Sequence, residues 1–135
     1  MSDGLNIPKN WTFKSENVAK NFDAHVREQL PWYDMVTMAI QHIARHYIPE
    51  GGIVYDIGAS TGNIGRALAP TLLERNATLY GLENSKEMCD IYDAPGTIIN
   101  ENALNHVYEP FDFAVCYLVL MFMPYGQRAA LLQRL

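Results

Sequence analysis

The chain has 135 residues, enough for one domain, and 49% hydrophobic and 19% charged residues indicate a globular rather than a disordered or fibrous protein. The net charge of -5 argues against a domain that holds nucleic acid through its phosphate backbone. Two cysteines without a CxxC pair exclude a disulfide framework. No signal peptide is visible, and the longest apolar run, residues 113–123, is shorter than the ~20 residues that span a bilayer, so we expect a cytoplasmic protein.

Hydrophobic periodicity predicts helices first and then strands that alternate with helices. Residues 1–10 are expected to form a loose arm, and a four-residue apolar step from Val18 to Leu30 predicts a helix that Pro31 ends. The further expected elements are a helix over 35–47, a strand over 53–57, a helix over 61–74, a strand over 77–82, a short helix capped by Ser85, a strand over 97–99, a strand within 111–122 and a helix from 125 to 135. Alternating strands and helices imply parallel βαβ units, so the expected fold is α/β, with a partial Rossmann-like sheet of about four parallel strands.

The most informative stretch, Val54 to Gly65, lies where the first predicted strand turns into the next helix. In open α/β sheets, ligands bind beyond the carboxyl ends of the strands, near the point where the strand order reverses. Gly58 and Gly62 would let the backbone approach a ligand closely, and the helix N-terminus offers free N–H groups. The stretch therefore predicts a ligand-binding site.

Three kinds of site compete for this stretch. A dinucleotide site requires GxGxxG, whereas Ser60 and Asn63 stand at the second and third glycine positions. Residues 58–62 also fit the GxSxG pattern of α/β-hydrolases, but His106 is the one histidine downstream and too little chain follows for the later strands of that fold. The third kind binds S-adenosylmethionine (SAM), a ligand with an amino-acid end and no phosphate.

Two acidic residues favour the SAM site. Asp56 lies at the end of the first strand, where it can orient the loop or bind the ligand's ammonium group, directly or through water. Glu83 follows Gly62 by 21 residues and lies at the end of the second strand, where a carboxylate accepts hydrogen bonds from both ribose hydroxyls. Alone, either could be a loop acid or a neighbour of a helix N-cap. Together, at the ends of consecutive strands, they favour a ligand.

With these features the chain resembles a class I SAM-dependent methyltransferase, and within that group it is similar to the carboxy-S-adenosylmethionine synthase family. The similarity covers residues 11–135. The residues that carry it are Trp11, Thr12, Phe13, Val18, Ala19, Phe22, Pro31, Tyr33, the stretch 54–62, Asn84, Ser85, Met88 and residues 130–132.

The resemblance implies roles for individual residues. Tyr33 would close over the ligand, the loop 58–60 would line its amino-acid end, and Glu83 with Asn84 would hold the ribose and the neighbouring edge of the adenine. Residues 102–103 would flank the adenine. Joined to the positions derived above, the candidate cofactor-binding residues are Tyr33, Asp56, Gly58, Ala59, Ser60, Gly62, Glu83, Asn84, Asn102, Ala103 and Tyr117.

Two of these positions depart from the family's pattern. Asn102 stands where the family usually has an aspartate that receives the adenine amino group, and its amide oxygen can still accept that bond. Tyr117 stands where the family has an asparagine at the end of the fourth strand. We expect Tyr117 to fill the space of the reacting group, which speaks against a carboxylated cofactor.

The end of the sequence also departs from the family, whose members have seven strands in the order 3-2-1-4-5-7-6. Because the chain stops after the fourth strand and part of a helix, we expect a fragment or a truncated gene. The uncharged stretch 114–120 would then form an open edge that can pair with another copy. Within one structural domain, residues 1–50 would form an arm and two helices that cover the cofactor site, and residues 51–135 a SAM-binding half-domain.

Other chemistry-bearing residues have simpler interpretations. His42 and His46 have a metal-compatible spacing, but no acidic residue or cysteine accompanies them, so we expect a solvated helix face and no metal. Cys89 and Cys116 are expected to be buried or half-buried. The methionines expected in the core are Met35, Met38, Met121 and Met123.

The sequence thus predicts a SAM-binding, methyltransferase-like enzyme that transfers a one-carbon group to an unknown acceptor. Methyl transfer from a sulfonium depends mainly on alignment, so no catalytic residue is assigned. If the closer resemblance is functional, the reaction would instead carboxylate the cofactor's methyl group, with prephenate as donor, for tRNA wobble-uridine modification. The other alternative is a non-catalytic module that binds or oligomerises through its open edge.

Overall fold

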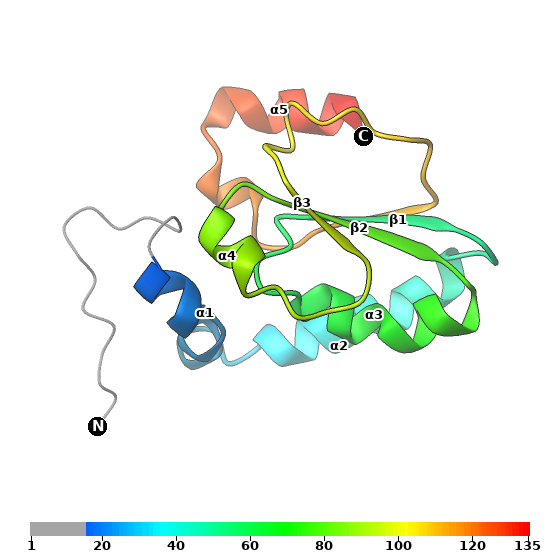
Figure 1. Ribbon diagram of the computed structural model, residues 1–135, viewed down its shortest axis with the longest axis horizontal. Helices are drawn as coiled ribbons and strands as arrows, with labels where there is room; N and C mark the ends of the chain where they lie inside the picture. Colours follow the sequence, from blue (N-terminus) through cyan, green and yellow to red (C-terminus); the bar gives the residue numbers. More distant parts are fainter. Residues whose placement is uncertain (1–15) are drawn as a thin grey trace.

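The computed structural model describes residues 16–135, so the predicted arm and the matches at residues 11–13 lie outside the described residues. A central sheet is covered by α2 and α3 on one face and by α5 on the other (Figure 1). The elements are α1 (Glu16–Gln29), α2 (Tyr33–Tyr47), β1 (Ile53–Ile57), α3 (Asn63–Glu74), β2 (Thr78–Glu83), α4 (Lys86–Asp90), β3 (Thr97–Asn100), β4 (Phe113–Cys116), the 3-10 helix η1 (Leu120–Phe122) and α5 (Tyr125–Arg134).

The four strands are parallel and lie in the order β3-β2-β1-β4, which confirms the predicted α/β sheet. In the register of the sheet, Ile57 of β1 pairs with Leu82 of β2 and with Cys116 of β4. Because parallel strands end at the same edge, the residues that follow β1, β2 and β4 come together there. This edge is the place at which the sequence predicted a ligand.

Alternate residues of the strands build two apolar clusters on opposite faces of the sheet. Under α2 and α3 the buried members are Ala44, Ile48, Val54, Ile64, Leu68, Leu72, Leu79 and Val115. On the other face Leu131 of α5 belongs to the second cluster, whose buried strand members are Tyr55, Ile57 and Leu82. Leu131 is fully buried, so α5 is attached to the sheet by an apolar contact.

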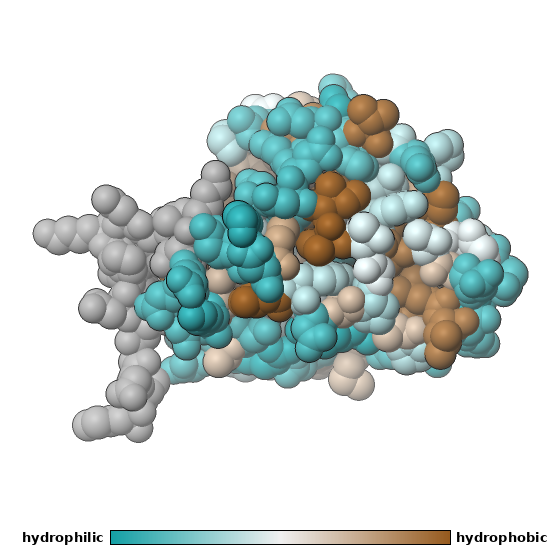
Figure 2. Space-filling view, viewed as in Figure 1, coloured by the Kyte–Doolittle hydropathy of each residue, from teal (hydrophilic) through white to brown (hydrophobic). Residues whose placement is uncertain are grey.

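Three methionines that were expected in the core are exposed, which corrects the sequence prediction. Met35, Met38 and Met121 have exposed fractions of 66%, 67% and 59%. In α2 apolar residues surround most of the helix, so their spacing does not identify the buried face, which carries Thr37 and Ala44 instead. Hydrophobic residues reach the surface in several separate groups among hydrophilic ones on the face seen in Figure 2.

Two element boundaries differ from the predicted ones because of left-handed backbone. Helix α3 begins at Asn63 rather than at residue 61, since Gly62 before it has a φ of 105°. Strand β4 ends at Cys116 although the apolar run continues to residue 123, because Leu118 has a φ of 58° and the chain then turns into η1. The predicted cap of α4 is confirmed: Ser85 Oγ accepts the Met88 amide at 3.2 Å.

Candidate functional site

A cavity of about 370 Å³ lies at the carboxyl ends of β1, β2 and β4. Ten of the eleven candidate residues line this cavity. They are Tyr33, Asp56, Gly58, Ala59, Ser60, Glu83, Asn84, Asn102, Ala103 and Tyr117. Residues far apart in the sequence thus meet around one space, and whether they bind a cofactor there stays a prediction.

Asp56 and Glu83 form the acidic end of the cavity. Asp56 is 1% exposed, and within residues 16–135 its Oδ2 atom has no hydrogen-bond partner. Burial, and then the charge of Glu83, raise the pKa of the Asp56 carboxyl to about 7. Burial also raises the pKa of Glu83 to about 7, although the backbone amides of Asn84 and Ser85 donate to its carboxylate. A cation beside these groups would stabilise their ionised forms.

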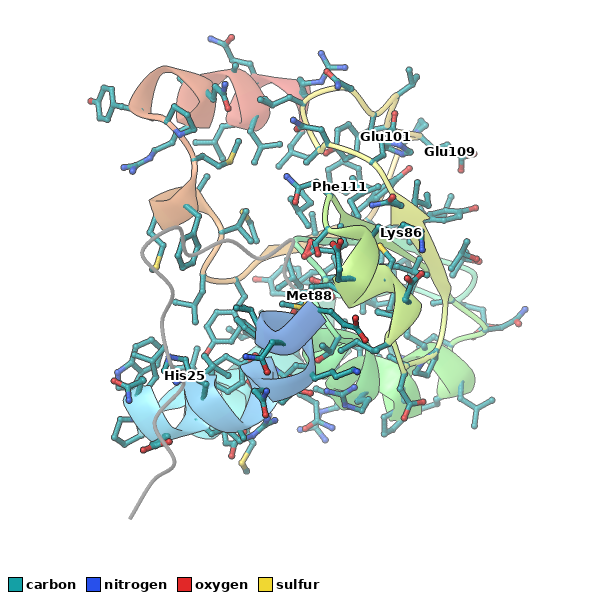
Figure 3. The ribbon with its side chains drawn as sticks, turned by 60° about the vertical axis from the view of Figure 1, so that its left-hand side comes forward. His25, Lys86, Met88, Glu101, Glu109 and Phe111 are labelled. Atoms are coloured by element: carbon teal, nitrogen blue, oxygen red, sulfur yellow. The ribbon has the colours of Figure 1, made fainter. Side chains whose placement is uncertain are left out.

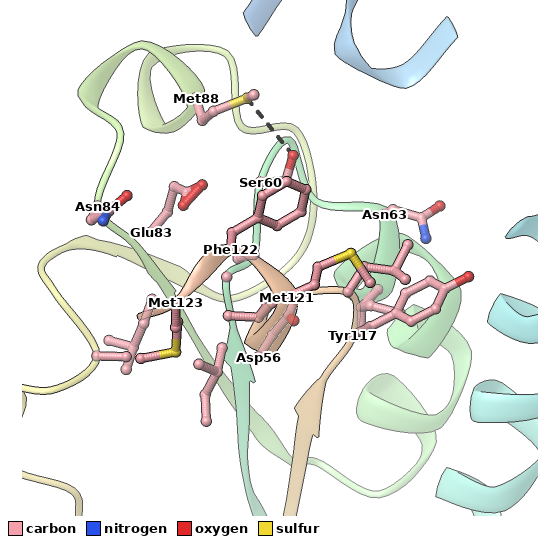
Figure 4. A pocket seen from close by; sticks show the side chains of 18 of the residues that line it. Asp56, Ser60, Asn63, Glu83, Asn84, Met88, Tyr117, Met121, Phe122 and Met123 are labelled. Atoms are coloured by element: carbon pink, nitrogen blue, oxygen red, sulfur yellow. Dashed lines mark hydrogen bonds between the residues drawn. The ribbon is translucent and has the colours of Figure 1, made fainter. Parts of the chain in front are cut away.

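The loop after β1 bends across the end of β2. The amides of Gly58 and Ala59 both donate to the Leu82 carbonyl, at 2.8 and 2.9 Å. A Cβ on Gly58 would collide with the side chain of Val119, so glycine is required where this loop meets the segment after β4. Ser60 has a φ of 54°, and its hydroxyl donates to Met88 Sδ at 3.7 Å, the dashed line in Figure 4. The loop is therefore fixed before any ligand binds.

Gly62 is the candidate that does not line the cavity, and its contact with a cofactor stays a prediction. It precedes α3, and a Cβ at this position would lie 2.6 Å from the Cβ of Ala94 and 3.2 Å from Tyr92 Cε2. Glycine is required here for the left-handed turn and for the close packing of the segment after α4. Its role in the structure is thus to support the loop.

Tyr33 and Tyr117 form the side of the cavity next to α2. Their rings stack with centroids 5.2 Å apart, and the Tyr117 hydroxyl donates to the Tyr33 carbonyl at 3.0 Å. Figure 4 shows Tyr117 and Glu83 on opposite sides of the cavity. Tyr117 therefore lines the space without separating Asp56 from Glu83.

The segment after β3 contributes Asn102 and Ala103, as expected, and also Glu101, which the sequence analysis missed. Asn102 Oδ1 accepts the Leu104 amide at 2.9 Å, so one of its two lone pairs is used within the segment. Glu101 Oε2 lies 2.7 Å from His106 Nδ1. Its position directly before Asn102 was the available signal for its presence in the site.

Two apolar walls of the cavity consist of residues that were not among the candidates. One comes from α1 and the residue after it, through Phe22, Val26 and Leu30, and the other from residues 121–123 of η1 and its end. The sequence analysis expected the N-terminal helices to cover the cofactor site but named none of these three residues as part of it. The run containing residues 121–123 had the pattern of a strand, so no signal pointed to a cavity wall.

Polar contacts hold α1 over the loop. The Thr61 hydroxyl donates to Asp23 Oδ1 at 2.6 Å, and Arg27 Nη2 donates to Asn63 Oδ1 at 3.1 Å. Helix α1 also contacts α4, where Met88 lies next to it in Figure 3. The start of α3 and the loop before it are thereby joined to the N-terminal helices.

The charged residues that line the cavity are all acidic within the described range 16–135: Asp56, Glu83 and Glu101, with no lysine, arginine or histidine. In the same part of the chain no group of three or more His, Cys, Asp or Glu could hold a metal ion. None of the described helices is both long and apolar enough to cross a membrane. His42 and His46 are exposed, as expected, and Cys89 and Cys116 are partly buried.

Comparison with known proteins identifies relatives with one common name. A carboxy-S-adenosyl-L-methionine synthase of Staphylococcus epidermidis is 33% identical over 121 residues, which cover 86% of this chain and 53% of the relative. One of Marinobacter nauticus is 29% identical over 137 residues, 95% of this chain and 54% of the relative. The chain thus spans about half the length of the curated relatives it matches. No family model matches the sequence.

Solved structures show the same fold. A protein from Methanococcus maripaludis, proposed to be an S-adenosyl-L-methionine-dependent methyltransferase, matches with a TM-score of 0.67 and 19% identity over 93% of this chain and 59% of its own. The plantazolicin methyltransferase BpumL, solved with SAH, matches with a TM-score of 0.60 and 14% identity over 85% of this chain and 46% of its own. The fold is that of class I methyltransferases, and the chain is homologous to carboxy-S-adenosyl-L-methionine synthases, as its motifs indicated.

Proposed function

We propose that this chain binds SAM at the carboxyl ends of β1 and β2 and serves in the transfer of a one-carbon group from it. The observation that carries the proposal is the pair of carboxyl groups at the ends of these adjacent strands, Asp56 with an unpartnered buried oxygen and Glu83 beside it. The names of the relatives and the SAH bound to a protein of the same fold support it.

The residues present fit the chemistry of SAM. Glu83, at the end of β2, would accept hydrogen bonds from the ribose hydroxyls, and Asp56 would attract the ammonium group. Bound SAM supplies a methyl carbon that its sulfonium makes electrophilic. The chain's part is to hold that carbon in line with an acceptor, for which the loop 58–60, already tied to Leu82, provides a fixed support.

Calorimetric titration of the 135-residue chain with SAM tests the proposal, with Glu83→Ala as the variant. Loss of charge-assisted hydrogen bonds should weaken binding by about 1.5–3 kcal/mol, or roughly tenfold to a hundredfold. Glu74→Ala is the control, because it removes the same charge from an exposed position at the end of α3. Two outcomes would overturn the proposal: a folded wild-type chain that shows no binding heat with SAM, or an equal loss of SAM affinity in both variants.

A second candidate function is carboxylation of the SAM methyl group, which the name of the 33% identical relative favours. Within residues 16–135 the lining of the cavity offers no cation to a second carboxylate, so we place this candidate second to methyl transfer. The two differ in their product. Mass spectrometry after incubation with SAM and prephenate would show a product heavier by one carbon dioxide if the second candidate holds, and unchanged SAM otherwise.

Three further expectations stay predictions. A cytoplasmic location is proposed from the sequence alone. Self-association is proposed through β4, which forms one edge of the four-stranded sheet. If the chain is a non-catalytic module, light scattering should show dimers both with and without SAM, and no SAM should be consumed. An enzyme would consume SAM in the presence of its acceptor.

A further inference from the structure

Asp56 Oδ2 is the one buried side-chain nitrogen or oxygen atom within residues 16–135 that has no hydrogen-bond partner. Asp56 lines the cavity, is 1% exposed, and lies within β1, next to its last residue. A buried carboxyl oxygen without a hydrogen-bond partner is costly, and the cost is greatest when the group is ionised. A ligand in the cavity that brings a positive charge would remove this cost.

No basic group within the described residues supplies that charge. The titratable groups whose interaction with Asp56 is resolved are Glu83 of β2, Cys116 of β4, Tyr33 of α2 and Tyr92 after α4. Arg27 of α1 pairs with Asp34 at 3.0 Å. Arg66 of α3 donates to the carbonyls of Thr61 and Asp93, at 2.9 Å each. Both cations are therefore bound to other acceptors.

Glu83 adds a second negative charge near Asp56 and so makes a cation in the cavity more favourable. Its charge acts on Asp56 through a poorly solvated space, where like charges repel more strongly than in water. Glu101, the third acidic residue of the lining, differs from these two because His106 lies within hydrogen-bond distance of its carboxylate. Within residues 16–135, Asp56 and Glu83 are thus the acidic residues of the cavity for which no basic partner is found.

We propose that Asp56 selects the ligand of this cavity by charge, so that a ligand with a net positive charge binds more tightly than its neutral counterpart. This inference rests on the proposed function and deepens it. SAM and S-adenosylhomocysteine share the ammonium that Asp56 would attract and a carboxylate that balances its charge. SAM carries a sulfonium in addition and is cationic overall, whereas S-adenosylhomocysteine is neutral, so the sulfonium is the charge that distinguishes the two ligands in this acidic cavity. The site would accordingly prefer SAM to the demethylated product. It would also release a proton when SAM binds near neutral pH, because a nearby cation favours the ionised carboxylates.

Calorimetry with matched ligands tests this preference. SAM, S-adenosylhomocysteine and sinefungin, which carries an amine in place of the sulfonium, are titrated at pH 8 into wild type, Asp56→Asn and Glu74→Gln, a matched change at an exposed position outside the cavity. We expect wild type and Glu74→Gln to bind both cationic ligands about tenfold more tightly than S-adenosylhomocysteine, and Asp56→Asn to lose that difference. Equal or tighter binding of the neutral ligand by wild type would overturn the inference while leaving the proposed function intact.

Proton release gives a second readout that needs no variant. Titrations of wild type at pH 7 in phosphate and in Tris, two buffers with different ionisation heats, should show more protons released with SAM than with S-adenosylhomocysteine. Equal release with both ligands would contradict the inference. Absence of binding by all three ligands and by adenosine would instead overturn the proposed function itself.

Discussion

The Tyr117 hydroxyl donates a 3.0 Å hydrogen bond to the carbonyl of Tyr33, while the two rings stack 5.2 Å apart. This contact joins the residue after β4 to the first residue of α2 across 84 positions of the chain. The Thr37 hydroxyl donates to the same carbonyl at 2.9 Å. The Tyr33 carbonyl therefore keeps a hydrogen-bond partner if Tyr117 loses its hydroxyl. Loss of that hydroxyl should thus cost only the net free energy of one hydrogen bond.

Tyr117→Phe should lower the free energy of unfolding by about 0.5–1.5 kcal/mol, the net value of one hydrogen bond, since the ring stack remains. Tyr117→Ala should cost more, because it also removes the ring. Urea denaturation of both variants measures the difference. Equal losses of unfolding free energy in the two variants would mean that the stacked rings contribute nothing to stability.

The stability of the ligand-free chain should fall as the pH rises from about 4 to about 7. The folded-state pKa values of Asp56 and Glu83 are raised from 3.8 and 4.5 to about 7, so the folded state binds more protons than the unfolded state in this window. The effect is fully developed above pH 7 and is on the order of a few kcal/mol.

Urea denaturation at pH 5 and pH 8 measures this dependence, and Asp56→Asn identifies its source. The asparagine cannot ionise, so the variant should lose less stability between the two pH values and be more stable than wild type at pH 8. A wild type that gains stability from pH 5 to pH 8 would contradict the assignment.

Gly62→Ala should destabilise the fold by about 2–4 kcal/mol, because a side chain at a φ of 105° is strained and its Cβ would meet Ala94. Since Gly62 does not line the cavity, the folded fraction should still bind SAM. Gly126→Ala in α5 is the control, because nothing lies within 4 Å of its added Cβ. Thermal unfolding measures both variants. A lower Tm for Gly126→Ala than for Gly62→Ala would refute this interpretation.

Leu118 offers a test of backbone strain at the cavity. A bulky residue with a φ of 58° is costly, and glycine adopts this conformation freely. Leu118→Gly should therefore be more stable than Leu118→Ala by about 1 kcal/mol, the reverse of the usual order of these residues. Chemical denaturation of the two variants decides between the two orders.

The attachment of α1 should depend on Asp23. Asp23→Ala removes the acceptor of the Thr61 hydroxyl and should cost only about 0.5–1.5 kcal/mol, since the side chain is partly exposed. Hydrogen exchange of the α1 amides should accelerate. Glu28→Ala, an exposed change on the same helix, should leave their protection unchanged. Equal exchange in the two variants would show that Asp23 does not anchor α1.

The sequence by itself determined the elements and the acidic end of the site. The short β-rich run from Ile53 to Ile57 is β1 at the predicted residues, and Glu83 ends β2 as expected. Both features depend on local pattern: alternating helices and strands imply parallel pairing, and parallel pairing places consecutive strand ends at one edge. The strand order β3-β2-β1-β4 followed from the resemblance that these motifs carry.

The tertiary structure alone decided which side chains close the cavity and which polar atom is left there without a hydrogen-bond partner. Two examples depend on contacts between segments far apart in the chain. Asp23 accepts a hydrogen bond from Thr61, and Met121 lines the cavity although it is largely exposed. Local periodicity carries no information on such contacts. Nor does it show that Asp56 Oδ2 is buried without a partner, since that requires every neighbouring element to be in place.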